Sequence, residues 1–310
     1  DYDGTTYTNY KGKGGLQLNL FNRVMFAIKS GDTLNMLTTS NISSNSKILL
    51  NRNIVKRAQM AVPFLLVDED PYIVITKDGR LKWVLDAYTL TNYYPYSGEV
   101  ENPKGFNYIR NSVKVIIDAY DGDVQYYIID KTDPIINTYK KIYPGVFKEG
   151  PIPEDIASHM RYPEYLFKVQ TDVMKRYHLN PDDTNSDNVS VFYSNQDKWD
   201  IAKTPGVEKG QENRNIEPYY NMIKLPGKIG KKEELILMRP FTPSEGKHNM
   251  VSWLAVRNSS ENYGELILFT FPVNKNILGP DQVDVNIDQI AEVSESKTLW
   301  NQSGSQVFKG

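Results

Sequence analysis

Apolar and polar residues alternate most clearly on either side of Asp121 and Gly122. Two alternating apolar runs joined by Asp-Gly are typical of a β-hairpin, which would here span residues 107–130. A two-residue turn would place Ile117 opposite Tyr126. We expect the apolar face of this hairpin to be buried in the main sheet, while the opposite face is free to meet water or a ligand.

A second Asp-Gly pair, Asp78 and Gly79, interrupts the strand-like residues 71–88. It predicts another hairpin, in which a two-residue turn would set Val74 opposite Trp83. Both faces of this hairpin are mostly apolar, so we expect it to be covered on both sides.

Other stretches show helical spacing. Phe21, Met25 and Ile28 recur on one side of a predicted helix, and Gly31 suits a left-handed C-terminal cap. Asp133, which a proline follows, predicts the start of a helical middle segment.

The last third of the chain returns to short, strand-like apolar runs. These runs predict an antiparallel meander that includes a third hairpin at residues 250–271. Residues 282–287 alternate valine and isoleucine with polar side chains, which predicts an edge strand.

The helices are grouped along the chain and do not alternate with the strands, so the predicted fold class is α+β. Its antiparallel sheets would be built from the hairpins at 71–88, 107–130 and 250–271, with the helical segment in the middle. The length fits one large domain or two packed lobes. Such lobes would be residues 1–133, with helices and the central hairpins, and residues 134–310, with the helical segment and the meander.

Composition narrows the classes of function. Hydrophobic residues make up 40% of the chain, which is enough for a core. The 36 basic and 38 acidic side chains nearly balance, and this gives no support to nucleic acid or an anionic membrane surface as the main partner. The sequence contains no cysteine, which excludes disulfides, thiolate metal sites and a cysteine nucleophile.

No apolar run reaches the roughly 18 residues that a membrane span requires. No signal peptide is visible either. The sequence begins at Asp1 and ends at Gly310 without an obvious stop, so we interpret it as a segment of something longer.

Familiar catalytic motifs do not occur in the sequence. There is no His-Glu-x-x-His, no Gly-x-Ser-x-Gly, no Walker loop and no set of kinase motifs. His159, His178 and His248 are unrelated in spacing, which favours surface or packing roles over metal ligation. The sequence therefore leans against an enzyme.

One weak candidate for anion binding is the run of Lys11, Gly12, Lys13, Gly14 and Gly15, which precedes the first predicted helix. Backbone N–H groups at a helix start, together with two lysines, could hold a phosphate. No strong strand precedes the run, so the dinucleotide fingerprint is not met. A flexible lead into the helix is the favoured explanation.

A weak candidate for metal binding is the trio Asp118, Asp121 and Asp123. Carboxylates that converge there would suit calcium, although the spacing is not that of an EF-hand. Aspartate is also favoured at hairpin turns for its own hydrogen bonding, so turn geometry is the alternative explanation. We expect no other cofactor.

The main candidate for ligand binding is where a tyrosine-rich loop meets the central hairpin. Tyrosines form a stacking platform in many binding surfaces, and arginine can hold a carboxylate or phosphate with two hydrogen bonds. The competing explanation is that the arginine pairs with an internal acid, that the asparagines fix the loop and that the tyrosines pack against the sheet. The candidate residues are Tyr94, Tyr96, Asn107, Tyr108, Arg110 and Asn111.

Eight stretches resemble uncharacterised protein family 0182 in their residues and in their order along the chain. They are TYTNYKGKGG, VPFLLVDEDPY, YPYS, NYIRNSVK, DAYDG, RYPEYLFKVQ, FTP and LWNQSGSQVFKG. The resemblance extends from about Tyr7 to Gly310. Members of the family look like bacterial multi-pass membrane proteins with a large extracytoplasmic region, and this chain is similar to the later part of that region.

The resemblance implies a location at the extracytoplasmic face of the cell membrane, but it brings no activity and no catalytic residue. We therefore expect a non-catalytic binding or scaffolding module. Its partner would be an envelope glycan, a peptide, another envelope protein or the family's own transmembrane region. The alternative is an envelope enzyme of unfamiliar type, such as a metal-assisted hydrolase that uses the aspartate trio.

Overall fold

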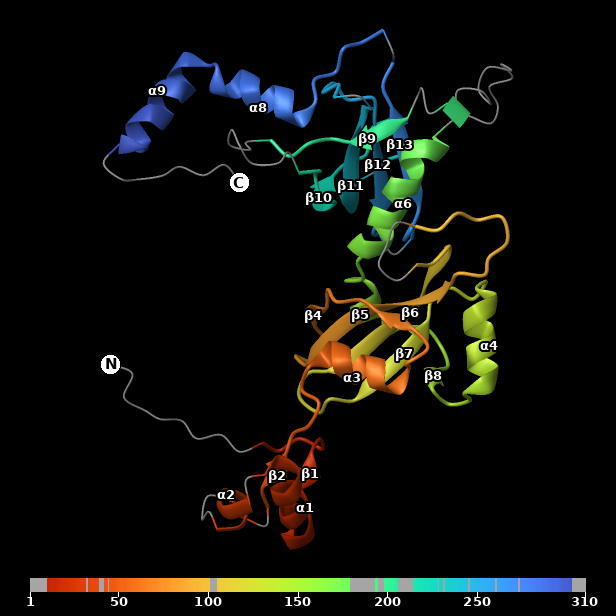
Figure 1. Cartoon of the computed structure of the whole chain (residues 1–310), viewed down its shortest axis with the longest axis vertical. Helices are drawn as coiled ribbons and strands as arrows, with labels where there is room; N and C mark the ends of the chain where they lie inside the picture. The colour runs from red at the N-terminus through yellow and green to blue at the C-terminus, as the bar shows by residue number, and fades with distance from the viewer. Residues whose placement is uncertain are drawn as a thin grey trace. The chain divides into compact units, whose positions relative to one another are not determined.

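Strand β6 (Tyr108–Asp118) is the middle strand of the first large sheet, between β5 (Leu81–Thr91) and β7 (Val124–Ile128). The central hairpin therefore occupies the position that the sequence predicts (Figure 1). The two large sheets are antiparallel in all but one strand pair, and helices stand before, between and after these sheets along the chain. The predicted α+β fold class is confirmed.

This structure is a computed structural model, and the part of the chain that it describes has several gaps. The described residues are 10–31, 33–38, 42–43, 45–100, 105–178, 193–194, 198–205, 214–227, 229–230, 232–244, 246–259, 261–272 and 274–302. They belong to two units, residues 1–159 and residues 160–310.

The boundary between the units lies further along the chain than residue 133, near which the sequence favours a division. Ile136 and Phe147 explain this position, because both are buried in the core of the first unit. Residues 134–159 therefore belong with the hairpins that precede them.

The first unit contains one small sheet, one large sheet and five helices among its described residues. In chain order its other elements are β1 (Leu16–Gln17), α1 (Leu20–Ser30), α2 (Thr33–Thr38), β2 (Lys47–Ile48), α3 (Ile54–Ala61), β3 (Leu66–Val67), β4 (Tyr72–Ile75), α4 (Pro134–Ile142), β8 (Phe147–Lys148) and α5 (Glu154–Ala157). The large sheet has the order β3-β5-β6-β7-β8, with β4 also paired to β5, and only β7 and β8 run parallel.

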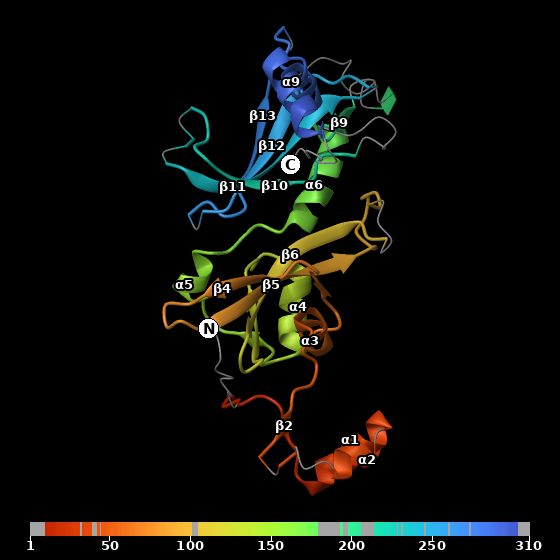
Figure 2. The same cartoon turned by 90° about the vertical axis from the view of Figure 1, so that its left-hand side faces the viewer.

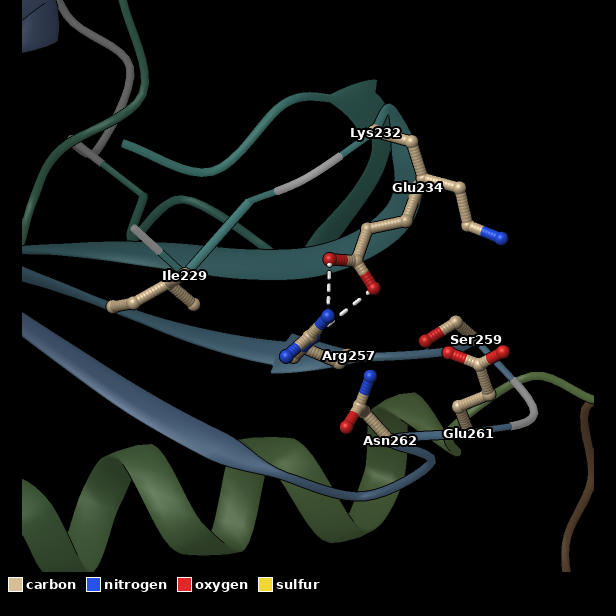
Figure 3. A pocket seen from close by; sticks show the side chains of 7 residues that line it. All are labelled: Ile229, Lys232, Glu234, Arg257, Ser259, Glu261 and Asn262. Carbon is tan, nitrogen blue, oxygen red and sulfur yellow. Dashed lines mark hydrogen bonds and ion pairs between the residues drawn. The ribbon is translucent and has the colours of Figure 1, made fainter. Parts of the chain in front are cut away.

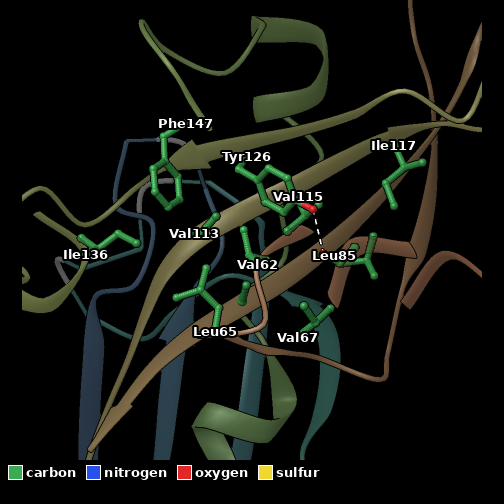
Figure 4. Close-up of a cluster of buried hydrophobic side chains, with 12 residues drawn as sticks. Val62, Leu65, Val67, Leu85, Val113, Val115, Ile117, Tyr126, Ile136 and Phe147 are labelled. Carbon is green, nitrogen blue, oxygen red and sulfur yellow. Dashed lines mark hydrogen bonds between the residues drawn. The ribbon is translucent and has the colours of Figure 1, made fainter. Parts of the chain in front are cut away.

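One face of this sheet forms the main core with helices α3 and α4 (Figures 1 and 4). Val113, Val115 and Ile117 of β6 are almost fully buried there, as the alternation predicts. The hydroxyl of Tyr126 donates to the backbone oxygen of Ala58 in α3 at 2.7 Å, and burial raises the pKa of Tyr126 to about 12. Burial of each aliphatic side chain, such as that of Val113, contributes about 1.5–3 kcal/mol to the stability of the fold.

The opposite face of the sheet is buried as well, contrary to our expectation. Ile116 packs against Ile156 of helix α5, and Lys114 is completely buried. The ammonium of Lys114 lies 2.6 Å from a carboxylate oxygen of Asp86 in the neighbouring strand. The polar residues on this face therefore pair with one another and do not face water.

The register of the central hairpin differs by two residues from the predicted one, because the loop is longer than two residues. Ile117 pairs with Val124, and the carboxylate of Asp118 accepts hydrogen bonds from the backbone of Tyr120 and Asp121 at 2.9 and 2.7 Å. These bonds favour a four-residue loop, in which Gly122 adopts φ of 75°. A shift of two residues leaves the predicted faces unchanged.

The hairpin at 71–88 is shifted by one residue, so Ile73 and not Val74 lies opposite Trp83. Its loop has three residues and ends on Gly79 with φ of 79°, a common alternative to the two-residue turn. Ile73 and Ile75 are exposed. Strand β4 is therefore not covered on both sides, contrary to the prediction.

The second unit is built on a five-stranded antiparallel sheet (Figure 2). Its elements are α6 (Glu164–Tyr177), β9 (Trp199–Ile201), β10 (Tyr219–Ile223), β11 (Glu234–Pro243), β12 (Ser252–Arg257), β13 (Leu266–Thr270), α8 (Pro280–Asp288) and α9 (Ala291–Trp300). The order β10-β11-β12-β13 is the predicted meander, and β9 also pairs with β11.

The predicted edge strand at residues 282–287 is wrong, because these residues lie in helix α8. The backbone N–H of Gly279 donates to the side chain of Gln282 at 2.9 Å, and Pro280 occupies the first turn. Both features are typical of a helix start. No residue of α8 is buried, so its alternating apolar residues do not mark a core face.

No helix in the described part of the chain is both long enough and apolar enough to cross a membrane.

Candidate functional site

Three of the six candidate ligand-binding residues come together at the start of strand β6. The ring of Tyr94 stacks on the ring of Tyr108, with 5.3 Å between centroids and an interplanar angle of 18°. The guanidinium of Arg110 lies 5.8 Å from the centroid of the Tyr108 ring, within range of a cation–π contact. We call Tyr93, Tyr94, Tyr96 and Tyr108 the tyrosine platform.

Asn107 holds the platform loop in place. Its side-chain oxygen accepts from the backbone N–H of Tyr94 at 3.0 Å, and its amide nitrogen donates to the backbone oxygens of Tyr94 and Ser97 at 2.8 and 3.1 Å. Tyr93 and Tyr96 are 87% and 109% exposed, and Tyr96 adopts the left-handed φ of 59°. The loop thus presents exposed rings on a backbone that Asn107 fixes.

Arg110 is engaged by the chain itself. Its Nη1 donates to a carboxylate oxygen of Asp130 and to the hydroxyl of Thr132, both at 2.9 Å. Burial acts to raise the pKa of Asp130, but the bonds from Thr132 and Arg110 outweigh it and lower that pKa. Pairing of Arg110 with an internal acid is therefore what the geometry shows, and Arg110 serves the platform by flanking Tyr108.

The hydroxyl end of Tyr108 is anchored in the protein. It donates to Asp133 at 3.1 Å, and burial followed by the charge of Asp133 raises the pKa of Tyr108 to about 12. Asp133 is fully buried and also accepts from the hydroxyls of Thr89 and Ser112 at 2.6 and 2.5 Å. The same carboxylate caps helix α4 through the backbone N–H of Ile135, so the platform rests on a helix start.

Asn111 has a different environment from the rest of the candidate set. It lies opposite Tyr88 in the sheet. Burial raises the pKa of Asp86, and Lys114 and then Asn111 act to lower it. Asn111 therefore belongs to the buried polar face of the sheet, and we leave it out of the platform.

The predicted metal residues lie at the other end of β6, where cations of the protein already hold Asp118 and Asp121. One carboxylate oxygen of Asp118 accepts from Arg80 at 2.7 and 2.9 Å and from Lys82 at 2.7 Å. Burial acts to raise the pKa of Asp118, but the bonds from Lys82, the backbone and Arg80 hold it well below its ordinary value. Arg80 also bonds Asp121 at 2.8 Å.

The predicted anion-binding run contacts this same loop. The backbone N–H of Lys13 donates to Asp121 at 2.8 Å, and that of Lys11 donates to the hydroxyl of Tyr120 at 2.9 Å. A Cβ atom on Gly14 would stand 2.5 Å from the backbone oxygen of Asp121. The glycine at this position is therefore explained by close approach of two backbone segments.

The run does not open a helix, so the helix-start geometry we expected for an anion is absent there. Strand β1 follows Gly15, and the side chain of Asn19 caps α1 by accepting from Asn22 at 2.9 Å. Two weak candidate sites that lie far apart in the sequence thus bind each other.

A cavity of about 310 Å³ lies beside this loop. Its lining includes all three predicted aspartates together with Arg80 and Lys82. Across the described residues, no group of three or more histidine, aspartate or glutamate side chains is placed to hold a metal ion. Calcium binding by the trio stays a prediction.

A cavity of about 420 Å³ in the second unit was missed by sequence reasoning (Figure 3). Arg257 lines it and bonds the two carboxylate oxygens of Glu234 at 3.0 and 2.8 Å. These bonds raise the pKa of Arg257, and a further bond joins it to Glu265 at 2.8 Å. Ser259 and Asn262 lie on the loop after β12, beside the pair.

This cavity could not be found from the sequence, because Arg257 and Glu234 meet only through the register of β11 and β12. The buried hydroxyl oxygen of Ser259 has no hydrogen-bond partner among the described residues. The lining also includes Lys232, Glu261 and Asn262, while Arg257 and Glu234 neutralise each other.

The three histidines lie in different surroundings, as their spacing predicts. His159 contacts the backbone oxygen of Asp155 at 2.8 Å, and His178 stacks on Trp199 with 3.8 Å between ring centroids. His248 pairs with Asp281.

Comparison with known proteins shows to which family the chain belongs. Residues 1–300 of the chain match the group described as Uncharacterised protein family (UPF0182). The chain belongs to the UPF0182 family. The resemblance seen in the sequence is thereby confirmed.

Several UPF0182 relatives match almost the whole chain. A UPF0182 protein of Caldicellulosiruptor saccharolyticus is 50% identical over 309 residues, which is 99% of this chain and 32% of the relative. One from Desulfitobacterium hafniense is 46% identical over 308 residues, 98% of this chain and 30% of the relative. One from Methanospirillum hungatei is 42% identical over 313 residues, 99% of this chain and 33% of the relative.

The chain thus spans about a third of the length of these UPF0182 relatives, and their names state no activity. No solved structure gives a significant match. Any function must therefore be inferred from the geometry of the chain itself.

Proposed function

We propose that this chain is the extracytoplasmic part of a membrane-anchored UPF0182 protein and serves as a non-catalytic binding or scaffolding module at the cell envelope. The observation that carries the binding role is the tyrosine platform, with exposed rings on a backbone held by Asn107. The resemblance to multi-pass membrane proteins supports the location. The relatives' additional length could supply the anchor.

The platform has the properties of a binding surface. Tyrosine offers a large apolar ring with few rotatable bonds, so it loses little entropy on binding. Asn107 fixes the backbone at Tyr94 in the unbound protein, and this pre-organisation lowers the cost of association. The stacked pair of Tyr94 and Tyr108 suits the face of a sugar ring or the side chain of a peptide.

The alternative of a metal-assisted hydrolase gains no support from the geometry. Such an enzyme needs carboxylate oxygens that are open to a metal ion or to water. Asp118 and Asp121 instead hold Arg80, Lys82 and the backbone of Lys13.

Binding of envelope glycan fragments and peptides to the 310-residue chain tests the proposal. Tyr94→Ala and Tyr96→Ala should each weaken binding about tenfold, as expected for an aromatic anchor. Asn107→Ala should weaken it less, because the rings remain while the loop loses three hydrogen bonds. Tyr177→Ala is the matched control, since Tyr177 is also an exposed tyrosine but lies in the second unit.

An equal loss of binding in Tyr177→Ala, or unchanged binding in both platform variants, would exclude the platform as the binding surface. Circular dichroism of each variant separates loss of binding from loss of fold.

A further inference from the structure

Helix α1 carries its apolar stripe on the outside. The exposed large apolar residues of the helix are Leu20, Phe21, Val24, Met25 and Ile28. At 100° per residue they cover an arc of about 140° of the helix surface. Ala27, the buried residue of α1, lies about 20° from Leu20, at one edge of this stripe. A stripe of this kind normally faces a core, so sequence reasoning would bury the side that the structure exposes.

Neighbouring segments extend the exposed apolar surface of the N-terminal part. Leu16, Leu37, Leu49 and Leu50 are exposed as well, which makes nine such residues among those described between positions 16 and 50. Single exposed apolar residues are ordinary, but a cluster of this size marks a surface that meets a partner or a membrane.

The wider segment that contains this surface, residues 4–67, is basic. Residues 4–67 contain eight lysines and arginines and one acidic residue, Asp32, which gives them a net charge of +7 in a chain of net charge −2. The near balance of the whole chain therefore hides a local excess of positive charge. The basic residues are Lys11, Lys13, Arg23, Lys29, Lys47, Arg52, Lys56 and Arg57.

Carboxylates do not neutralise this charge in the part of the chain that the structure describes. Arg23 donates to the backbone oxygen of Met36 at 2.9 Å, Lys47 to that of Gly12 at 2.8 Å and Arg57 to that of Gly122 at 2.6 Å. Backbone oxygens accept hydrogen bonds but carry no net charge, so the positive potential remains.

We propose that α1 lies in the interface of an anionic lipid bilayer, with Phe21 and Met25 inserted and Lys29 among the phosphates. A helix with an apolar arc and basic flanks binds such membranes through apolar burial and electrostatic attraction together. A second copy of this chain is a poorer partner for the apolar stripe of α1, because two surfaces of the same positive charge repel each other. The inference does not depend on the tyrosine platform.

Vesicle flotation of the 310-residue chain tests this inference. Vesicles of phosphatidylcholine with phosphatidylglycerol should bind at least about tenfold more protein than phosphatidylcholine alone. The double variant Phe21→Glu/Met25→Glu should lose about tenfold in binding, and Lys29→Glu about fivefold. High salt should weaken the preference for anionic vesicles.

The matched control is Val285→Glu/Leu299→Glu, which changes two exposed apolar residues of α8 and α9 in the second unit. It should float as the unchanged chain does. The inference is overturned if the unchanged chain stays unbound, if both double variants lose binding equally, or if Phe21→Glu/Met25→Glu instead breaks up a dimer or a complex with an acidic protein.

Discussion

The two ends of strand β6 carry the two main candidate sites of the first unit. The two sites differ in how far their side chains are already engaged by other residues of the chain. At the Asp118 end, carboxylates meet Arg80, Lys82 and the backbone of Lys13, so the charged groups are satisfied within the chain. At the Tyr108 end, hydrogen bonds fix the loop but leave ring faces exposed. The charged groups at the first end stabilise the fold, and we propose that the exposed rings at the second end bind a ligand.

The comparison teaches that the residue types at a site do not reveal whether their chemistry is already used. The aspartate trio suggests a metal ligand in the sequence, but Arg80 and Lys82 already pair with Asp118, and Arg80 also pairs with Asp121. Tyrosines suggest sheet packing, but the loop before β6 exposes Tyr93, Tyr94 and Tyr96 to solvent. Mutation at each end should separate effects on stability from effects on binding.

The largest loss of stability should come from the buried pair between the two ends. Lys114→Met should cost about 3–5 kcal/mol in the free energy of unfolding, because it leaves Asp86 buried without its cation. Urea unfolding measures this loss. The double variant Asp86→Leu/Lys114→Met should recover most of it, and failure to recover would show that packing, not charge, sets the cost.

Asp118→Asn should be the next most harmful change, at about 1.5–3 kcal/mol, because it weakens charged hydrogen bonds to Arg80 and Lys82. Asp123→Asn, which changes an exposed aspartate of the same cavity, should cost less than about 0.5 kcal/mol. Equal losses in the two variants would contradict the structural role of Asp118.

The lowered pKa of Asp118 determines how it contributes to stability at different pH. The folded pKa of Asp118 lies below its unfolded value of about 3.9, so its contribution is present above that pH and is lost as pH falls through the folded pKa. As the pH is lowered below about 4, the free energy of unfolding should therefore fall more steeply in the unchanged chain than in Asp118→Asn. Parallel curves would argue against this contribution.

Gly14→Ala should cost about 1–3 kcal/mol, because a Cβ atom would stand 2.5 Å from the backbone oxygen of Asp121. Hydrogen exchange at the backbone of Lys13, which bonds Asp121, should speed up. Gly98→Ala is the matched control, since a Cβ atom there meets nothing within 4 Å. Unchanged exchange in Gly14→Ala would mean that the two segments do not dock as described.

The smallest expected effect is that of calcium. Arg80 and Lys82 already hold the carboxylate of Asp118, so adding calcium or a chelator should leave the melting temperature within about 1 °C. A clear rise with calcium would contradict this expectation and support the metal site that the aspartate trio suggests.

The sequence predicted much of the fold because local signals agreed with tertiary structure. Asp133 and Gly31 cap helices as expected, and alternation identified the buried face of β6. Registers were missed because the loop at Asp118 is set by its side-chain bonds to the backbone, which Asp-Gly alone does not reveal. The strand predicted at 282–287 failed because alternation without a partner strand is not evidence of a sheet.

For the candidate sites, the sequence could predict which residues belong together but not which partners already hold them. The sequence found Tyr94, Tyr108 and Arg110 because they lie where the tyrosine-rich loop meets the predicted hairpin, and the structure places them in contact. It could not show that Asp130 engages Arg110. Nor could it pair Arg257 with Glu234, because only the strand register brings them together.

The most direct test is to measure ligand binding and stability together in Tyr94→Ala and Asp118→Asn. If the two ends differ as we infer, Tyr94→Ala loses binding of the envelope fragment about tenfold while its unfolding free energy changes by less than about 1 kcal/mol. Asp118→Asn should show the reverse, with lower stability and unchanged binding. Loss of binding in Asp118→Asn alone, with Tyr94→Ala unaffected, would contradict the assignment of the binding surface to the tyrosine platform.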